Sequence, residues 1–410
     1  MQGRIWQHFL NILLLSGLAA CQSFLPDLPE ENELLDGPEE GLSTEEQGIF
    51  LAGDIAFNDE IFTPATGLGP IFVASSCASC HVGDGKGHPT NALTRFSQTA
   101  SNEIVNRLLD KGGPQLQHRS IPGFTAEQIP PEANGVSKVV APAVTGLGFL
   151  AAIPDQTILD LVVQQRDEGI VSGEVQWVDV PGYLKPEPWQ ITNSEAQYIG
   201  RFGKKSAAIS ILQQVVGAYK QDMGVTTDFD TEDPINFSLS ANQIDPTIDP
   251  EIPASTVNGV VFYIRTLKRP LPRNQDEPSV IAGKSLFSQI QCSSCHLPVL
   301  KTGLSDISIL SEQEFYPYTD MLLHDMGPEL DDGHVDGNEL SFEWRTPPLW
   351  GLGLAPDSQG GQFFLMHDGR ATSIEEAILL HGGESESMKE SFEALDRDKK
   401  NQIIEFLESL

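Results

Sequence analysis

The chain has 410 residues, of which 40% are hydrophobic, so it is long enough for two or three domains with apolar cores. Its formal charge of −33 at pH 7 argues against nucleic acid as a partner, because a phosphate backbone is bound by Lys and Arg. A surface this acidic would attract a cationic protein, or would simply keep the chain soluble.

The N-terminal residues predict an export signal. Arg4 is the only charged side chain before an apolar stretch that extends from residue 9 to residue 20 and ends at Cys21. This stretch is too short to span a bilayer, and small residues directly before a cysteine are typical of bacterial lipoproteins. We therefore expect residues 1–21 to be a lipoprotein signal peptide with lipidation at Cys21. The lipid would anchor the chain in the bacterial periplasm or at the cell surface, at the outer membrane. Ordinary secretion is the alternative.

Residues 22–47 are rich in Glu, Asp and Pro, which predicts an acidic linker. Beyond this linker the sequence repeats itself once. A Cys-x-x-Cys-His motif occurs at residues 77–81 and again at 292–296. A Pro-x-φ-x-Gly-Leu-Gly pattern follows each motif, at residues 142–148 and 347–353. The repeat indicates two related domains.

Each Cys-x-x-Cys-His motif predicts one covalently bound haem c, because two thiols can reach the vinyl groups of a haem while the adjacent His binds the iron. The expected attachment residues are Cys77, Cys80 and His81 for the first haem, and Cys292, Cys295 and His296 for the second. A redox dithiol would not need the His twice, and a zinc site would need further ligands nearby. Together with the lipid site, the two motifs use all five cysteines, so no structural disulfide is expected.

The most periodic segments between the motifs are helical, for example residues 373–381, which begin with a capping box and place apolar residues on one face. Long loops with Gly and Pro connect such segments, notably residues 111–148 and 226–255. We therefore expect a mainly α fold with two cytochrome c-like haem domains, residues 48–250 and 251–410, and long connecting loops.

The repeat also suggests what covers the opposite face of each iron. His381 lies 89 residues after Cys292, and Gln165 lies 88 residues after Cys77. If His381 is the second axial ligand of the C-terminal haem, Gln165 leaves the N-terminal haem open, because an amide does not ligate iron there. The alternative is that His381 is a hydrogen-bonded core residue.

Further candidates are residue types that can bind iron, protons or carboxylates. His324 and Met326 could ligate either iron or lie beside it. If an open iron binds peroxide, Asp155 could take up and return a proton of that peroxide, although it could also cap a helix. Because a guanidinium group suits carboxylates, the sequence predicts haem-propionate contacts from Arg201, Arg345 and Arg370, each of which could equally form an ordinary ion pair.

Several of these segments together resemble the bacterial dihaem oxidoreductases, which are also described as thiol oxidoreductases. The resemblance extends from about residue 48 to the C terminus and is carried by residues 67–70, 76–81, 222–224, 323–328, 343–353 and 381–384. That family is similar to the dihaem cytochrome c peroxidases, in which the N-terminal haem is the peroxide site and a helix supplies Met to the other haem. The position that matches this Met is His381, which implies a lower potential for the C-terminal haem.

These observations leave three functions open. The first is an enzyme in which a small donor, such as a basic cytochrome c, reduces the C-terminal haem, and hydrogen peroxide is reduced at the open N-terminal haem. The second is a non-enzymatic dihaem electron carrier, and the third is a redox partner in iron handling. Thiol chemistry has no support, because no thiol remains after haem attachment.

Overall fold

A computed structural model describes residues 34–239 and 247–410 of the chain. The predicted signal segment with Cys21, and the beginning of the acidic linker, therefore lie outside the described residues. No helix in the described part is long and apolar enough to span a bilayer. The elements below all belong to one unit, Leu35–Leu410.

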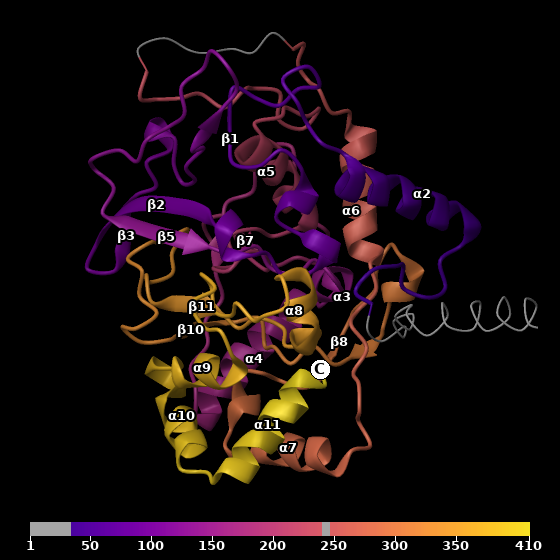
Figure 1. Cartoon of the computed structure of the whole chain (residues 1–410), viewed down its shortest axis with the longest axis vertical. Coiled ribbons are helices and arrows are strands. Elements are labelled where there is room, and N and C mark those ends of the chain that lie inside the picture. Colours follow the sequence, from indigo (N-terminus) through magenta and orange to yellow (C-terminus); the bar gives the residue numbers. More distant parts are fainter. Residues whose placement is uncertain (1–33, 240–246) are drawn as a thin grey trace, which may run out of the picture. The chain divides into compact units, whose positions relative to one another are not determined.

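Two pairs of packed helices organise this unit. Their bounds are α2 (Thr44–Asp54) with α6 (Ala254–Thr266), and α7 (Pro278–Gln289) with α11 (Arg397–Glu408). Figure 1 shows α2 across α6 in the upper half and α7 against α11 at the lower end. Glycine permits both close contacts, because a Cβ at Gly53 would lie 2.2 Å from the carbonyl oxygen of Gly259, and a Cβ at Gly283 would lie 1.9 Å from that of Gln402.

Each helix pair contributes to a buried apolar cluster. The first cluster contains Phe50, Phe57, Val257 and Tyr263, and the second contains Phe287, Phe392, Ile403 and Phe406. Each Cys-x-x-Cys-His motif follows the first helix of its pair and begins as a 3₁₀ turn, η3 (Cys77–Ser79) or η7 (Cys292–Ser294). The two motifs therefore occupy corresponding places in the fold.

Shorter helices complete the two clusters. Helix α5 (Ile211–Met223) packs on α6, and α9 (Ile374–Leu379) packs on α11. The remaining helices are α3 (Leu147–Ala151), α4 (Asp155–Glu168), α8 (Ala355–Ser358) and α10 (Glu386–Glu393). Single helical turns are η2 (Ile55–Asp59), η4 (Val82–Asp84), η5 (Pro89–Asn91), η6 (Leu109–Lys111), η8 (Ser308–Leu310), η9 (Leu352–Leu354) and η10 (Gly383–Ser385).

The prediction of a mainly α fold is wrong, because helices make up 34% of the structure and strands 13%, which is a mixed α/β fold. The strands form small antiparallel sheets. The largest has the order β3-β2-β5, from β2 (Leu93–Ala100), β3 (Glu103–Asn106) and β5 (Gly135–Val139). The two-stranded sheets are β1 (Ile71–Phe72) with β4 (Arg119–Ser120), β6 (Trp177–Val178) with β7 (Tyr198–Ile199), β8 (Leu300–Lys301) with β9 (Glu314–Phe315), and β10 (Leu323–Asp325) with β11 (Glu343–Arg345).

Strands β4 and β5 fall in residues 111–148, which the sequence assigns to a loop, and most of the other strands fall in segments for which it predicts no element. Strands of two or three residues show no alternation of apolar and polar side chains, so their pattern is invisible in the sequence. They pair because a backbone that runs through the interior must satisfy its N–H and C=O groups. Strands β10 and β11 illustrate this, since Leu323 pairs with Arg345 and His324 with Trp344.

Candidate haem sites

One cavity of about 460 Å³ is lined by both Cys-x-x-Cys-His motifs, with a volume in the range of small-molecule and cofactor sites. The motif residues that line it are Cys77, Cys80, His81, Cys292, Cys295 and His296. All four of these cysteines are free thiols, so no disulfide forms among the described residues. The structure therefore brings together the two predicted attachment sites.

The second motif has an imidazole on each side of a space that fits a haem iron. His296 donates from Nδ1 to the carbonyl oxygen of Tyr318 at 3.0 Å, and His381 donates from Nδ1 to that of Ala377 at 2.8 Å. Nε2 of both rings therefore remains available to bind a metal. Their centroids are 6.5 Å apart. An iron about 2 Å from each ring nitrogen would separate the centroids by roughly 6.3 Å, so these residues fit a haem with two axial imidazoles.

Burial holds these imidazoles neutral, which is the form that binds metals. It lowers the pKa of His81 to about 4, against an opposing effect of the Pro142 backbone. Burial, assisted by His381, likewise lowers the pKa of His296 to about 4. The pKa of His381 is also lowered by burial.

His324 lies at the cavity wall, but both of its nitrogens are occupied. Nε2 is 2.8 Å from a carboxylate oxygen of Asp320, and Nδ1 is 2.9 Å from one of Glu384. Burial lowers the pKa of His324, but hydrogen bonds to Asp320, Cys295 and Glu384 outweigh this and raise it to about 12. A charged imidazole without a free nitrogen does not fit the predicted role of iron ligand. Met326 lines the cavity and remains a candidate.

Gln165 is not where the sequence spacing places it. Its amide nitrogen donates to Asp320 at 2.7 Å and to the carbonyl oxygen of Ser294 at 3.1 Å. Its amide oxygen accepts from the backbone N–H of Gly173 at 2.9 Å. The side chain therefore lies beside the second motif, outside the lining of the cavity, and does not cover the first haem. The nearly equal spacing misleads, because α4 has no counterpart in the C-terminal half at that place.

Asp155 and Arg201 form a buried ion pair with each other. Asp155 also accepts from the backbone N–H of Ile191 at 2.6 Å, and Arg201 donates to the carbonyl oxygen of Leu150 at 3.0 Å. Neither residue lines the cavity, so the structure corrects their predicted roles in proton transfer and in propionate binding. Arg370 bonds Asp368 at 2.8 Å outside the cavity, which leaves Arg345 as the predicted arginine that lines it.

A repeat that the sequence spacing missed appears in the backbone. Residues 202–208 and 365–371 form matching turns, each closed by an antiparallel bridge between its first and last residue. Both turns have positive φ at their second and fifth positions. Adding 163 to each number in the first turn gives its counterpart in the second. The turns therefore correspond residue by residue.

The matching turns lead into α5 and α9. Ser210 caps α5 by accepting from the third residue of the helix at 3.2 Å, and Ser373 caps α9 in the same way at 3.1 Å. These two serines also differ by 163, and the same offset pairs His381 with Ala218. Ala218 lines the cavity. A methyl group, which cannot ligate iron, thus stands in the first half where an imidazole stands in the second.

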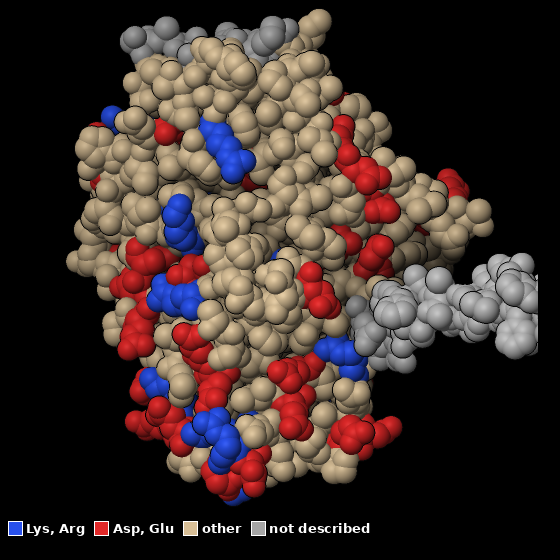
Figure 2. Space-filling model, in the orientation of Figure 1, with Lys and Arg blue, Asp and Glu red and all other residues tan. Residues whose placement is uncertain are grey.

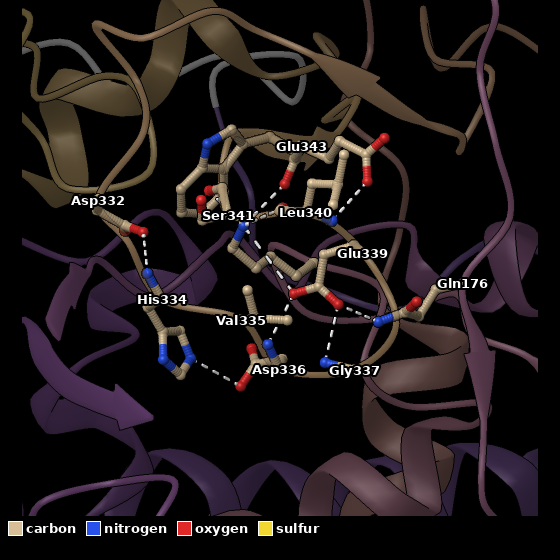
Figure 3. Close-up of polar contacts among 12 residues, drawn as sticks. Gln176, Asp332, His334, Val335, Asp336, Gly337, Glu339, Leu340, Ser341 and Glu343 are labelled. Carbon is tan, nitrogen blue, oxygen red and sulfur yellow. Dashed lines mark hydrogen bonds and ion pairs between the residues drawn. The ribbon is translucent and has the colours of Figure 1, made fainter. Parts of the chain in front are cut away.

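A polar network holds the loop before β11, which contributes His334 and Asp336 to the lining of the cavity. Glu339 accepts hydrogen bonds from the backbone N–H groups of Asp336 at 2.7 Å and Gly337 at 2.8 Å, and from the amide of Gln176 (Figure 3). Because Glu339 is buried, these bonds compensate for much of the cost of removing its carboxylate from water.

Lys205 fastens the same loop to the rest of the fold. Its ammonium group donates to the carbonyl oxygens of Ser341 and Glu343, both at 2.9 Å, and lies 4.0 Å from the centre of a Trp344 ring. Charge-assisted hydrogen bonds and a cation–π contact together hold β11 in place. As a result, Trp344 and Arg345 are presented to the cavity.

The structure adds cavity residues that the sequence did not single out, namely Lys86, Lys204, Gln214 and Ala218. The only available signal was the similarity of residues 203–211 and 366–374, in which a Ser-Ile pair begins each helix. That similarity is too short to be recognised without the matching turns.

The family model described as "Di-haem oxidoreductase, putative peroxidase" matches residues 135–410, and the chain belongs to this family. It is therefore a dihaem oxidoreductase, which confirms the resemblance seen in the sequence. No curated protein matches the chain.

Two solved structures are similar over most of their length. One is hydrazine synthase of Kuenenia stuttgartiensis, at 16% identity and a TM-score of 0.38, covering 94% of this chain and 96% of that one. The other is a MauG-like protein associated with microbial copper homeostasis, at 14% identity and a TM-score of 0.39, covering 94% and 95%.

Proposed function

We propose that this dihaem oxidoreductase reduces hydrogen peroxide with electrons from a small donor protein. The observation that carries the proposal is the asymmetry between the two halves, in which His381 faces His296 whereas the residue that corresponds to His381 in the first half is Ala218, which lines the same cavity as His81. A haem iron with two imidazole ligands transfers electrons, while one with an open position can receive a small oxidant. Reduction of one peroxide takes two electrons and two protons and yields two water molecules.

We further propose that both haems are attached covalently through the four cavity cysteines. Burial, with smaller contributions from nearby acids, raises the pKa of Cys77 to about 12, and burial raises that of Cys292 to about 12. A redox dithiol needs a thiolate near neutral pH, and these thiols are protonated there, which favours haem attachment over dithiol chemistry. Mass spectrometry of the denatured chain tests this, because two haems should remain attached.

Gln214 is our candidate for the residue that touches peroxide, in place of Asp155 and Gln165. It lies on α5 one turn before Ala218, so the two side chains share a helix face, and both line the cavity. Its amide has no hydrogen-bond partner among the described residues, and it is exposed. An amide at this position could donate to a bound peroxide oxygen and orient it.

The acidic surface supports a cationic donor that docks near the second motif. Figure 2 shows acidic side chains, with Lys and Arg among them, gathered over the lower part of one face, where α9, α10 and α11 lie in Figure 1, and acidic residues outnumber the four basic ones on these helices. The acidic residues of these helices are Glu375, Glu376, Glu386, Glu390, Glu393, Asp398, Glu405 and Glu408. A basic cytochrome c would be steered there, so its rate of electron transfer should fall as ionic strength rises.

The location of the protein is a proposal that rests on the sequence alone. A signal peptide and a lipid on Cys21 would hold the chain at the outer membrane on its periplasmic side, where c-type haems and small donor cytochromes occur together. Replacing Cys21 by Ser should release the protein from the membrane fraction into the soluble periplasm.

The decisive experiment is steady-state turnover of hydrogen peroxide with a reduced basic cytochrome c, combined with electron paramagnetic resonance of both haems. We expect turnover of hydrogen peroxide in the first assay and a high-spin signal from the first haem in the second. Two low-spin haems in both redox states, without turnover, would contradict it. That result would favour a dihaem electron carrier or a redox partner in iron handling.

A further inference from the structure

Six Lys and Arg side chains line the cavity, and three of them have no ion pair with a carboxylate in the described part of the chain. These three are Lys86, Lys204 and Arg345. Neither lysine ammonium has a hydrogen bond or an ion pair among the described residues. Arg345 uses Nε on the carbonyl oxygen of Gly203 at 3.0 Å and one terminal nitrogen on that of Thr346 at 3.3 Å. Its other terminal nitrogen has no partner in the described part of the chain.

These cations lie close enough to repel one another. The backbone N–H of Arg345 donates to the carbonyl oxygen of Lys204 at 3.0 Å, so the two residues sit on adjoining segments. Burial, with Lys86 and Arg345 adding to it, lowers the pKa of Lys204 to about 7. Burial alone lowers the pKa of Lys86 to about 8. Three positive groups in a water-poor wall are unfavourable unless an anion joins them.

No carboxylate of the described residues lies within ion-pair distance of these three groups, although Asp368 opposes the lowering of the pKa of Lys204 and Asp320 opposes that of Arg345 from farther away. The acids that line the cavity are Asp222 and Asp336. Asp336 pairs with Arg95 at 2.6 Å and with His334 at 3.0 Å. Asp222 accepts from the amide of Gln115 at 2.6 Å. Both carboxylates therefore have other partners, and the three cations are left for a ligand.

We propose that Lys86, Lys204 and Arg345 form one carboxylate-binding site, and that it takes the propionate groups of the haems. Each haem carries two propionates, and the site is on the wall of the cavity that both Cys-x-x-Cys-His motifs line. A planar guanidinium and two ammonium groups suit carboxylate oxygens. This site replaces the predicted contacts from Arg201 and Arg370 and is independent of whether peroxide is the substrate.

The site has a consequence for electron transfer. Positive charge beside a haem favours the reduced form, which carries one more electron, and therefore raises its reduction potential. Replacing Lys204 or Lys86 by Met should lower the potential of at least one haem. A tenfold change in the reduction equilibrium corresponds to about 59 mV for one electron.

Potentiometric titration of the fully haem-loaded protein tests the proposal, with resonance Raman spectra of the propionate bending modes as a second readout. We expect Lys204→Met and Lys86→Met each to shift the reduction equilibrium roughly tenfold and to alter those modes. Lys204→Arg should retain the wild-type values. The matched control is Lys284→Met, which removes one charge from an exposed position on α7 that does not line the cavity.

Two results would overturn the assignment. One is that Lys86→Met and Lys204→Met, both folded and loaded, show the potentials and bending modes of the control. If Lys204→Met does not fold, Lys204→Gln and Lys86→Met decide the matter. The other is a saturable change in wild-type potentials when sodium acetate is added at constant ionic strength, since that would show a site open to free carboxylates instead of one filled by propionates.

Discussion

Placing an imidazole at residue 218 should close the first haem. The turns and serine caps that precede Ala218 and His381 correspond, although α5 continues through residue 218 whereas α9 ends at Leu379. In the second half, this arrangement sets the rings of His381 and His296 6.5 Å apart, a separation that accommodates an iron. The variant Ala218→His should therefore convert the first haem from high spin to low spin.

The size of the effect follows from competition for one coordination position. If the new imidazole occupies the iron in about 99% of molecules, the fraction open to cyanide falls to about 0.01 and the apparent Kd for cyanide rises about 100-fold. Exchanging Ala for His within a helix costs only about 0.6 kcal/mol in helix propensity, so the variant should fold. Peroxide turnover should fall in parallel with cyanide binding.

The assay is a cyanide titration followed by optical and electron paramagnetic resonance spectra. Gly217→His is the matched control, because it carries the same side chain on another face of α5, where an added Cβ meets no atom within 4 Å. The control should keep wild-type affinity. An unchanged first-haem spectrum in a folded, fully loaded Ala218→His variant would refute the correspondence between residues 218 and 381, and with it the basis of the proposed function. Unaltered potentials in the lysine variants would leave that function intact.

Three further predictions concern other parts of the chain. His381→Ala should make the second haem high spin in electron paramagnetic resonance and leave the first unchanged; a response of both haems would contradict the assignment. Asp155→Ala leaves Arg201 buried without its anion, so the free energy of unfolding in guanidinium should fall by about 3–5 kcal/mol while the haem spectra stay the same. Burial raises the pKa of Glu127 to about 7, so its contribution to stability is complete below about pH 4.5 and is lost as the pH rises through 7. Glu127→Gln should therefore raise the free energy of unfolding by at most about 3 kcal/mol at pH 8 and leave it unchanged at pH 4.5, and melting curves at the two pH values test this.

The haem motifs could be predicted because their chemistry is local. Two thiols and an imidazole within five consecutive residues need no tertiary contact to be recognised, and the structure brings both sets to one cavity. The family assignment was equally accessible, since short motifs spread over most of the chain carried it. His381 could be singled out as a candidate as well, because it ends the periodic segment 373–381, although α9 itself ends at Leu379.

The residue of the first half that corresponds to His381 could not be located in this way. Counting residues from each motif paired His381 with Gln165, but the chain between the first motif and α5 contains α4 and several strands that disturb the count. The backbone turns before α5 and α9 show that Ala218 is the true counterpart. For Arg201 the structure shows the ordinary ion pair that the sequence left open, but the sequence does not reveal that Asp155 is its partner.

By itself, then, the sequence determined the family, and it predicted covalent haem attachment and two similar halves, all of which depend on residues that are near neighbours along the chain. Only the tertiary structure decided which residue of the first half corresponds to His381, which cations lack a carboxylate partner, and which short segments pair as strands. Those properties depend on distances between segments that are remote in sequence, and such distances are set by packing and by the need to pair buried polar groups.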